Sequence, residues 1–233
     1  ASFTATDVDE SYADAYDFGR NSTVMAVNMD SGSGDGDLDL IIGNLNGDLY
    51  YMINSGSASS ASFSSSSVTS SYGDSVDVVY YSAASAGDLD GDGDIDLVVG
   101  SSGGEIFYLE NTGSTTTATF DISSSSHYNT NLIGTIGVGN YSTPTAGDLD
   151  GDGDADLIIG EIYATLYYLE NTGSSSTPTF VASSLQSNYS SITVDTGQGY
   201  SKPTLVDMDN DGDLDLIIGE EDGNLNYIEN TDS

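Results

Sequence analysis

The stretch Gly87-Asp-Leu-Asp-Gly-Asp-Gly-Asp-Ile-Asp-Leu-Val-Val-Gly100 determines how this 233-residue chain folds. Aspartate stands at every second position from 88 to 96, and an uninterrupted apolar run follows. Nearly the same stretch returns at 147–160 and 206–219, and an altered copy runs from 28 to 43. A motif repeated in this way indicates that each copy is one supersecondary unit of a repeat protein.

Signals on both sides of the motif recur as well. A second apolar stretch that ends in a turn follows each copy, starting at Leu49, Ile106, Leu166 and Leu225. A small residue, a hydroxyl residue and Phe introduce each copy, at Ala1-Ser-Phe3, Ala61-Ser-Phe63, Ala118-Thr-Phe120 and Pro178-Thr-Phe180. The chain therefore divides into four units, 1–60, 61–117, 118–177 and 178–233, which we call units 1 to 4.

Each unit is predicted to contain four short strands. In unit 3 one strand starts at the Phe, one enters the Asp motif at 143–146, one leaves it at 156–160 and one closes the unit at 166–170. The strand after the motif is apolar at consecutive positions, which indicates burial on both faces by neighbouring sheets. We therefore predict an all-β, β-propeller-like fold, either a closed four-bladed ring or an open, head-to-tail array of blades.

The Asp motif has the chemistry of a calcium loop. Alternate carboxylates in a tightly curled loop can point at one centre, and Gly93 supplies the sharp turn. By analogy with the EF-hand loop, Asp88, Asp90 and Asp92 would donate side-chain oxygens, Asp94 its backbone carbonyl and Asp96 a carboxylate, directly or through water. The alternative is a solvated turn rich in Asp and Gly.

The same Ca²⁺ ligands are predicted in the other copies. They are Asp148, Asp150, Asp152, Asp154 and Asp156 in unit 3, and Asp207, Asp209, Asp211, Asp213 and Asp215 in unit 4. Unit 1 offers a wider loop with Asn28, Asp30, Asp35, Asp37 and Asp39. We expect three regular Ca²⁺ sites, and the loop of unit 1 allows a fourth.

The Asp loop, the apolar strand after it and the closing Glu-Asn-Thr-Gly resemble FG-GAP/VCBS-type repeats. These repeats are the calcium-loop blades of integrin α-subunit propellers and of many secreted proteins. The resemblance covers all four units and implies a β-propeller with calcium in a hairpin loop of each blade. Propellers of that family usually have seven blades, whereas this chain has four units.

Composition excludes several classes of partner. The chain has 38 acidic side chains against two basic ones, for a formal net charge of -36. Nucleic acids and anionic membranes are recognised by clusters of Lys and Arg, so neither is an expected partner. We expect no membrane insertion, because no apolar run approaches the roughly 18 residues of a transmembrane helix. Cysteine is absent, which excludes disulfides and thiolate metal sites.

The sequence leaves three functional classes to compare. An enzyme is not expected, because the one histidine, His127, lies in a Ser-rich stretch and calcium spacing accounts for the aspartates. A polysaccharide-degrading enzyme is accordingly the weakest alternative. A lectin-like or adhesion module could stack glycans on the loop tyrosines Tyr141, Tyr189 and Tyr200. A structural protein is the third class, and its expected partner is the chain itself, joined head to tail.

We predict the third class, an extracellular calcium-binding protein, secreted or at the cell surface, that forms part of a surface or a filament. Weak calcium sites would stay empty in the cytosol, which favours an extracellular setting. Three Asn-x-Ser/Thr sequons, at Asn21, Asn140 and Asn188, are candidate glycosylation sites.

Overall fold

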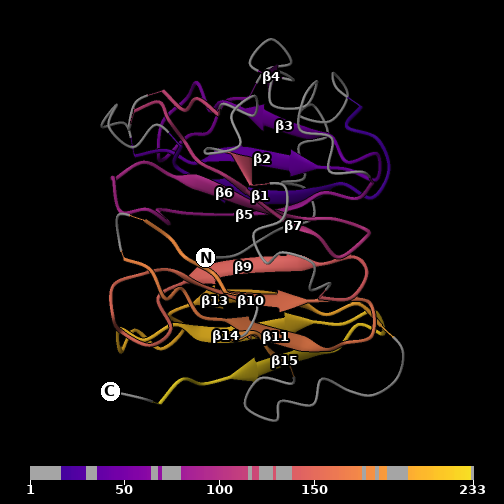
Figure 1. The fold of residues 1–233 in the computed structure, drawn as a ribbon. Helices are drawn as coiled ribbons and strands as arrows, with labels where there is room; N and C mark the ends of the chain where they lie inside the picture. Colours follow the sequence, from indigo (N-terminus) through magenta and orange to yellow (C-terminus); the bar gives the residue numbers. More distant parts are fainter. Residues whose placement is uncertain are drawn as a thin grey trace.

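The computed structural model describes residues 17–29, 36–63, 68–69, 80–114, 117–120, 128–129, 138–174, 177–181, 184–187 and 199–231. Within these ranges the fold is all-β, as the sequence predicts (Figure 1). The described strands form four antiparallel sheets, and each sheet is a meander of strands in chain order.

The strands are short and recur at matching positions. The first sheet holds β1 (Thr23–Val27), β2 (Asp39–Gly43), β3 (Leu49–Met52) and β4 (Val68–Thr69). The second holds β5 (Ala83–Gly87), β6 (Asp96–Gly100), β7 (Ile106–Leu109) and β8 (Tyr128–Asn129). The third holds β9 (Thr143–Gly147), β10 (Asp156–Gly160), β11 (Leu166–Leu169) and β12 (Gln186–Ser187). The fourth holds β13 (Lys202–Val206), β14 (Asp215–Gly219) and β15 (Leu225–Ile228).

One strand assignment differs from the prediction. The strand expected at the start of a unit joins the sheet of the preceding unit, because β4 pairs with β3, β8 with β7 and β12 with β11. The closing asparagine causes this return of the chain. The Oδ1 atoms of Asn54, Asn111 and Asn171 each accept a hydrogen bond at 2.8 Å from the backbone N–H of the residue before the Phe. The Phe segment is therefore held against the strand it has just left.

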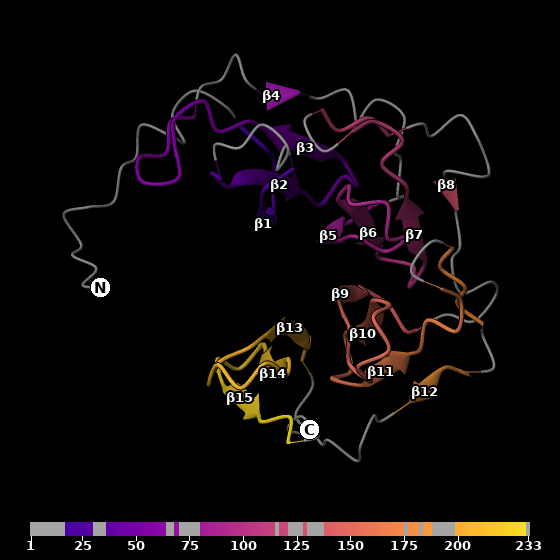
Figure 2. The ribbon, with the colours of Figure 1, turned by 90° about the vertical axis from the view of Figure 1, so that its left-hand side faces the viewer.

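The sheets follow one another around a common axis as an open arc of blades. Strands β1, β5, β9 and β13 are the inner strands, and β4, β8 and β12 lie at the outside (Figure 2). Neighbouring inner strands contact each other from β1 through β5 and β9 to β13. The four sheets do not close into a barrel, so the structure agrees with the open alternative.

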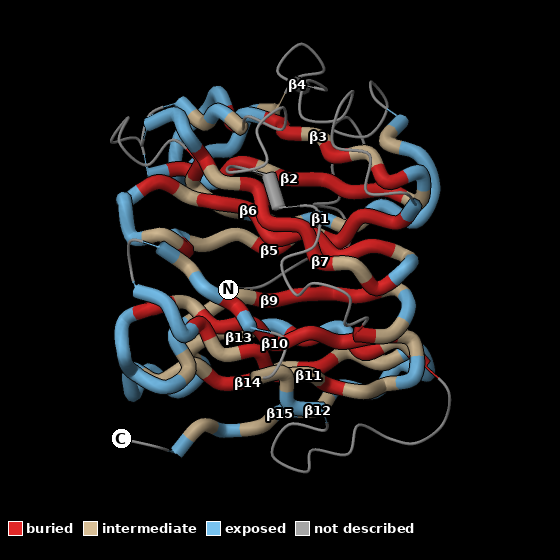
Figure 3. The backbone as a smooth tube through the Cα atoms, viewed as in Figure 1, coloured by how far each residue is buried: buried red, intermediate tan, exposed pale blue. Residues whose placement is uncertain are grey.

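The core lies between neighbouring sheets. Every residue of β6 and β10 is buried, which confirms that the apolar run after each Asp motif is covered on both faces (Figure 3). Three apolar clusters join unit 1 to unit 2, unit 2 to unit 3 and unit 3 to unit 4. In the last of these, Ile158, Leu166 and Tyr168 of unit 3 pack with Leu216 and Ile218 of unit 4. Each blade therefore depends on its neighbour for burial.

Candidate metal centres

The Asp motifs form the hairpin loops between the inner strand and the second strand of each sheet. Residues 88–95 connect β5 to β6, residues 148–155 connect β9 to β10, and residues 207–214 connect β13 to β14. Antiparallel pairing of Gly87 with Asp96 and of Gly147 with Asp156 closes the hairpins at equivalent registers. The repeated sequence thus gives repeated loops at the same end of each sheet.

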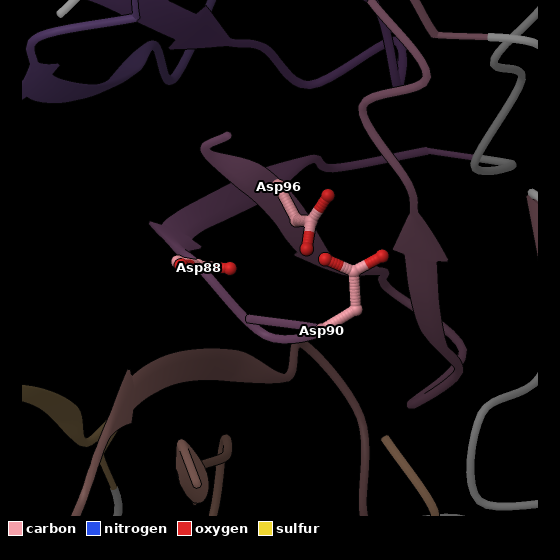
Figure 4. A group of neighbouring side chains, drawn as sticks. All are labelled: Asp88, Asp90 and Asp96. Carbon is pink, nitrogen blue, oxygen red and sulfur yellow. The ribbon is translucent and has the colours of Figure 1, made fainter. Parts of the chain in front are cut away.

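Carboxylates converge in all three loops. Asp88, Asp90 and Asp96 each bring an oxygen within 4.8 Å of the others in unit 2, and Figure 4 shows the three side chains turned toward one another. In the other loops the converging trios are Asp148, Asp150 and Asp152, and Asp207, Asp209 and Asp211. The structure thus brings together the first three predicted ligands in units 3 and 4, and the first, second and fifth in unit 2. These acidic groups could hold a metal ion.

Backbone hydrogen bonds curl each loop around its own carboxylates. In unit 2 the N–H of Gly93 donates to Asp88 Oδ2 at 3.1 Å, and the N–H of Asp94 donates to Asp92 Oδ1 at 2.8 Å. The matching bonds recur in units 3 and 4. Gly93 has a φ of 93°, a left-handed conformation that glycine adopts without strain, as the sequence predicts for the sharp turn.

The fifth aspartate of the motif anchors the hairpin. Asp96 is buried and accepts hydrogen bonds from the N–H of Asn111 at 2.7 Å, the N–H of Leu89 at 3.1 Å and the hydroxyl of Tyr108 at 3.1 Å. Asp156 and Asp215 make the equivalent three bonds. The sequence-based prediction gave these aspartates a calcium-binding role only and did not foresee their hydrogen-bond donors within the protein. The signal was present, because a tyrosine and an asparagine follow the aspartate at constant spacing in every unit.

Burial and like charge shape the electrostatics of the loops. Burial raises the pKa of Asp90, Asp94 and Asp154, and neighbouring carboxylates raise each of them further. Burial also raises the pKa of Asp96 to about 7 and that of Asp156 to about 6, against the hydrogen bonds that favour the charged form. For each of these five aspartates the charged form therefore costs free energy when no cation accompanies it.

Part of the predicted site of unit 1 is described. Asp39 takes the anchor position, with Met29 N–H, Tyr51 hydroxyl and Asn54 N–H as donors. Asp37 is buried, and Asn28 Oδ1 is a buried atom that has no hydrogen-bond partner among the described residues. Asp30 and Asp35 lie outside the described residues.

The remaining sequence candidates fall into two groups. His127, Asn188 and Tyr189 lie outside the described residues, whereas Asn21 and Asn140 are exposed. Tyr141 packs edge to face against both Tyr81 and Tyr200, with ring centroids 5.2 and 5.4 Å apart. These three tyrosines line a pocket of about 580 Å³ together with Asn21, Ser22, Lys202, Gly219, Glu220, Glu221, Gly223, Asn224 and Leu225. Among the described residues there is no helix long and apolar enough to cross a membrane.

Comparison with known families agrees with the repeats. The model of the FG-GAP-like repeat matches residues 33–99, 88–159 and 148–218. These are three matches rather than four. Each runs from one Asp motif into the strand after the next, so together they overlap all four motifs, the first of them only from residue 33 on. A comparison with curated proteins finds no match to the chain. Because the matches extend over well more than half of its length, the chain belongs to the FG-GAP-like repeat family.

Proposed function

We propose that the chain is an extracellular repeat protein that folds around Ca²⁺ and serves a structural role. The observation that carries this proposal is the convergence of three carboxylates in each of three equivalent hairpin loops. Each loop offers only oxygen donors, which are the ligands that Ca²⁺ prefers. Asn28 Oδ1, which is buried and has no hydrogen-bond partner in the described part of the chain, supports a further oxygen-rich site in unit 1.

Calcium suits these loops better than magnesium does. The loops offer several carboxylates and carbonyl groups, and Ca²⁺ accepts about six to eight such oxygens in variable geometry, whereas Mg²⁺ demands near-ideal octahedral geometry and dehydrates reluctantly. A bound cation would also relieve the repulsion that raises the pKa of Asp94 and Asp154. At a Ca²⁺ concentration ten times its Kd, each filled site would stabilise the fold by about 1.4 kcal/mol. Three sites would then supply a large part of a typical stability of about 5–15 kcal/mol.

The extracellular setting and the structural role rest on coarser observations. FG-GAP-like repeats are typical of extracellular proteins. Free calcium outside cells is high enough to fill weak sites of this kind. The repeats present stacked sheets and acidic loops, and the described aspartates of the repeated motif belong to candidate calcium loops or act as hairpin anchors. This arrangement favours a surface or filament component over an enzyme.

Thermal unfolding with and without calcium tests the proposal. We expect a chelator to lower the melting temperature by many degrees at constant ionic strength, and added Ca²⁺ but not Mg²⁺ to restore it. Asp152→Asn should reduce the calcium-dependent part of the shift, since the amide oxygen can still accept the Asp154 N–H while one ligand charge is lost. Asp222→Asn, on an exposed turn outside the loops, is the matched control. A melting temperature that ignores the chelator would refute the proposal.

Carbohydrate binding, in an adhesion or lectin-like module, is the second candidate. The observation that favours it is the pocket of about 580 Å³, where three tyrosines lie beside Lys202 and Asn224. Tyr81, Tyr141 and Tyr200 already pack against one another in edge-to-face contacts, which leaves less ring surface for a sugar. Saturable binding on a glycan array, lost in Tyr200→Ala, would promote this function.

A further inference from the structure

At each contact between neighbouring blades of the chain, one buried serine forms hydrogen bonds to the preceding blade. Ser82, Ser142 and Ser201 stand just before the inner strands β5, β9 and β13, and all three are 0% exposed. Their hydroxyl oxygens accept hydrogen bonds from a backbone N–H of the preceding unit at 2.9, 3.0 and 3.0 Å; the donors are Asn44, Ser101 and Glu161. The Ser82 hydroxyl also donates to the Asp48 carbonyl at 2.8 Å. The serine thus ties each blade to the blade before it.

A glycine in the preceding unit makes room for this serine. A Cβ atom at Gly43, Gly100 or Gly160 would lie 2.2, 2.1 or 2.3 Å from the carbonyl oxygen of the serine in the next unit. A side chain at these positions would therefore separate the two backbones. The equivalent residue of unit 4 is Gly219, where the nearest atom to such a Cβ is a methyl carbon of Leu225, at 3.9 Å.

The apolar part of each contact shows the same contrast. Leu49, Ile106 and Leu166 are 1%, 0% and 1% exposed because the next blade covers them, whereas the equivalent Leu225 is 77% exposed. Tyr51, Tyr108 and Tyr168 are 6%, 7% and 6% exposed, whereas the equivalent Tyr227 is 51% exposed. We call Gly219, Leu225 and Tyr227 the tail surface, since they present the covered face of an internal blade without a cover.

Unit 1, at the opposite end of the arc, exposes the kind of surface that covers the preceding blade in units 2, 3 and 4. Ser22 precedes β1 as Ser82 precedes β5, yet it is exposed. Val24 is 68% exposed, whereas the equivalent Pro144 and Pro203 are buried against the preceding blade. Ile42 on β2 and Met52 on β3 are buried, so the exposed part of this face is the inner strand β1. We call Ser22, Val24 and Ala26 the head surface.

We propose that the tail surface of one copy binds the head surface of a second copy. Copies would then join head to tail through a further joint of the same kind as the three within the chain, with Ser22 seated beside Gly219 and Val24 covering Leu225. Such a contact is heterologous, and its repetition gives a ring or a filament. The inference deepens the structural role proposed above and rests on it. It names the chain itself as the partner and the exposed ends of the arc as the interface.

Closure within one chain is the competing arrangement. The head and tail surfaces both border the pocket of about 580 Å³, because Asn21 and Ser22 line it together with Gly219 and Leu225. In the open arc, however, Val24 and Leu225 are both exposed, so the two surfaces of one copy do not cover each other. Each of the two surfaces lacks the cover that its equivalents have inside the chain, and a second copy offers both missing covers without any rearrangement of the arc.

Sedimentation velocity of the unglycosylated chain over a range of concentrations tests the interface. We expect larger species to grow with concentration in millimolar CaCl₂ and at least about 0.15 M salt, which screens the repulsion between acidic copies. Leu225→Glu should raise the concentration needed for assembly by more than about tenfold, since it charges the centre of the joint. Tyr163→Glu, at a 73% exposed position in a turn of unit 3, is the matched control and should assemble normally.

Mixing two blocked variants tests the polarity. Leu225→Glu keeps its head surface and Val24→Glu keeps its tail surface, so each alone should stay monomeric while the mixture gives a one-to-one dimer that grows no further. Both positions are exposed, so the monomers should fold, which circular dichroism checks. Absence of that dimer would overturn the proposal. So would a wild-type chain that is monomeric at every concentration while Leu225→Glu lowers its melting temperature, because that result indicates closure within one chain.

The two proposals fail in distinguishable ways. The melting temperature with calcium and with chelator is measured on the same samples. A calcium-stabilised chain that never assembles overturns the joint and leaves the calcium proposal standing. A chain that assembles but does not respond to the chelator overturns the calcium proposal alone.

Discussion

Units 3 and 4 carry nearly the same residues in different surroundings. Asp156 and Asp215 each accept hydrogen bonds from a backbone N–H of the closing asparagine, from a tyrosine hydroxyl and from the N–H within the loop, at distances between 2.8 and 3.3 Å. Burial nevertheless raises the pKa of Asp156 to about 6, while the hydrogen bond from Asn230 lowers the pKa of Asp215 below its ordinary value. Unit 4 covers the sheet of unit 3, whereas Tyr227 beside Asp215 is half exposed. The neighbouring blade, rather than the repeat itself, therefore sets the properties of each repeat.

The largest difference in stability between the two units is expected when the anchor aspartates Asp156 and Asp215 are replaced. Asp156→Ala leaves two backbone N–H groups and the Tyr168 hydroxyl without their acceptor inside the protein, and should cost about 3 kcal/mol or more of unfolding free energy. Asp215 is as buried as Asp156, but its donor Tyr227 is 51% exposed, so water can replace part of the bonds lost in Asp215→Ala and the loss should be clearly smaller. Urea unfolding in excess calcium measures both. Equal losses would contradict the role given to the neighbouring blade.

Replacing the equivalent residues Leu166 and Leu225 by alanine should give a smaller difference in the free energy of unfolding. Leu166→Ala opens a cavity between units 3 and 4 and should cost about 3 kcal/mol. Leu225→Ala changes an exposed side chain and should alter the stability of the monomer by less than about 0.5 kcal/mol. Both are measured by urea unfolding at concentrations too low for assembly. A loss at Leu225 as large as that at Leu166 would show that the tail surface is covered within one chain.

The smallest effect is a difference in pH dependence. Asp96 and Asp156 have folded pKa values of about 7 and 6, above the roughly 3.9 of an unfolded aspartate. In chelator, their contribution to stability is present at low pH and is lost as the pH rises through about 6 to 7. Asp215 has a lowered pKa and acts in the opposite direction, losing its contribution as the pH falls. Because the loss for Asp215 occurs below about pH 4, the melting temperature in chelator should fall between about pH 4 and 7.

Calcium should reverse this trend, because Ca²⁺ binds the deprotonated carboxylates and competes with protons. Thermal scans at matched pH values with and without calcium provide the measurement. A melting temperature that rises with pH in chelator would contradict the raised pKa values of the internal anchors.

Much of the fold could be predicted from the sequence. The apolar runs at 97–99 and 157–159 were predicted to be buried on both faces, and they lie between two sheets. The alternating aspartates were predicted to converge, and three of them do so in each regular loop. These features are local, because a period of two or a tight turn depends on residues that are close in the chain.

Features that depend on distant residues were harder to predict. The Phe segments pair with the preceding sheet because Asn111 and Asn171 capture the backbone beyond the turn, which no periodicity reveals. The anchors Asp96 and Asp156 have protein donors for both oxygens, which only the folded tyrosine and asparagine supply. The exposure of Leu225 is likewise invisible in a sequence where it matches the buried Leu166.

Counting the bound calcium ions tests the central claim most directly. Isothermal titration of the chelator-stripped chain with CaCl₂ should show at least three ions per chain, one for each carboxylate trio, and one fewer in a variant that combines Asp148→Asn with Asp152→Asn. The double substitution Asp222→Asn with Glu170→Gln, at acidic positions outside the trios, should leave the count unchanged. Binding of no calcium, or a count that is insensitive to the loss of the trio in unit 3, would contradict the assignment of the aspartate loops as calcium sites.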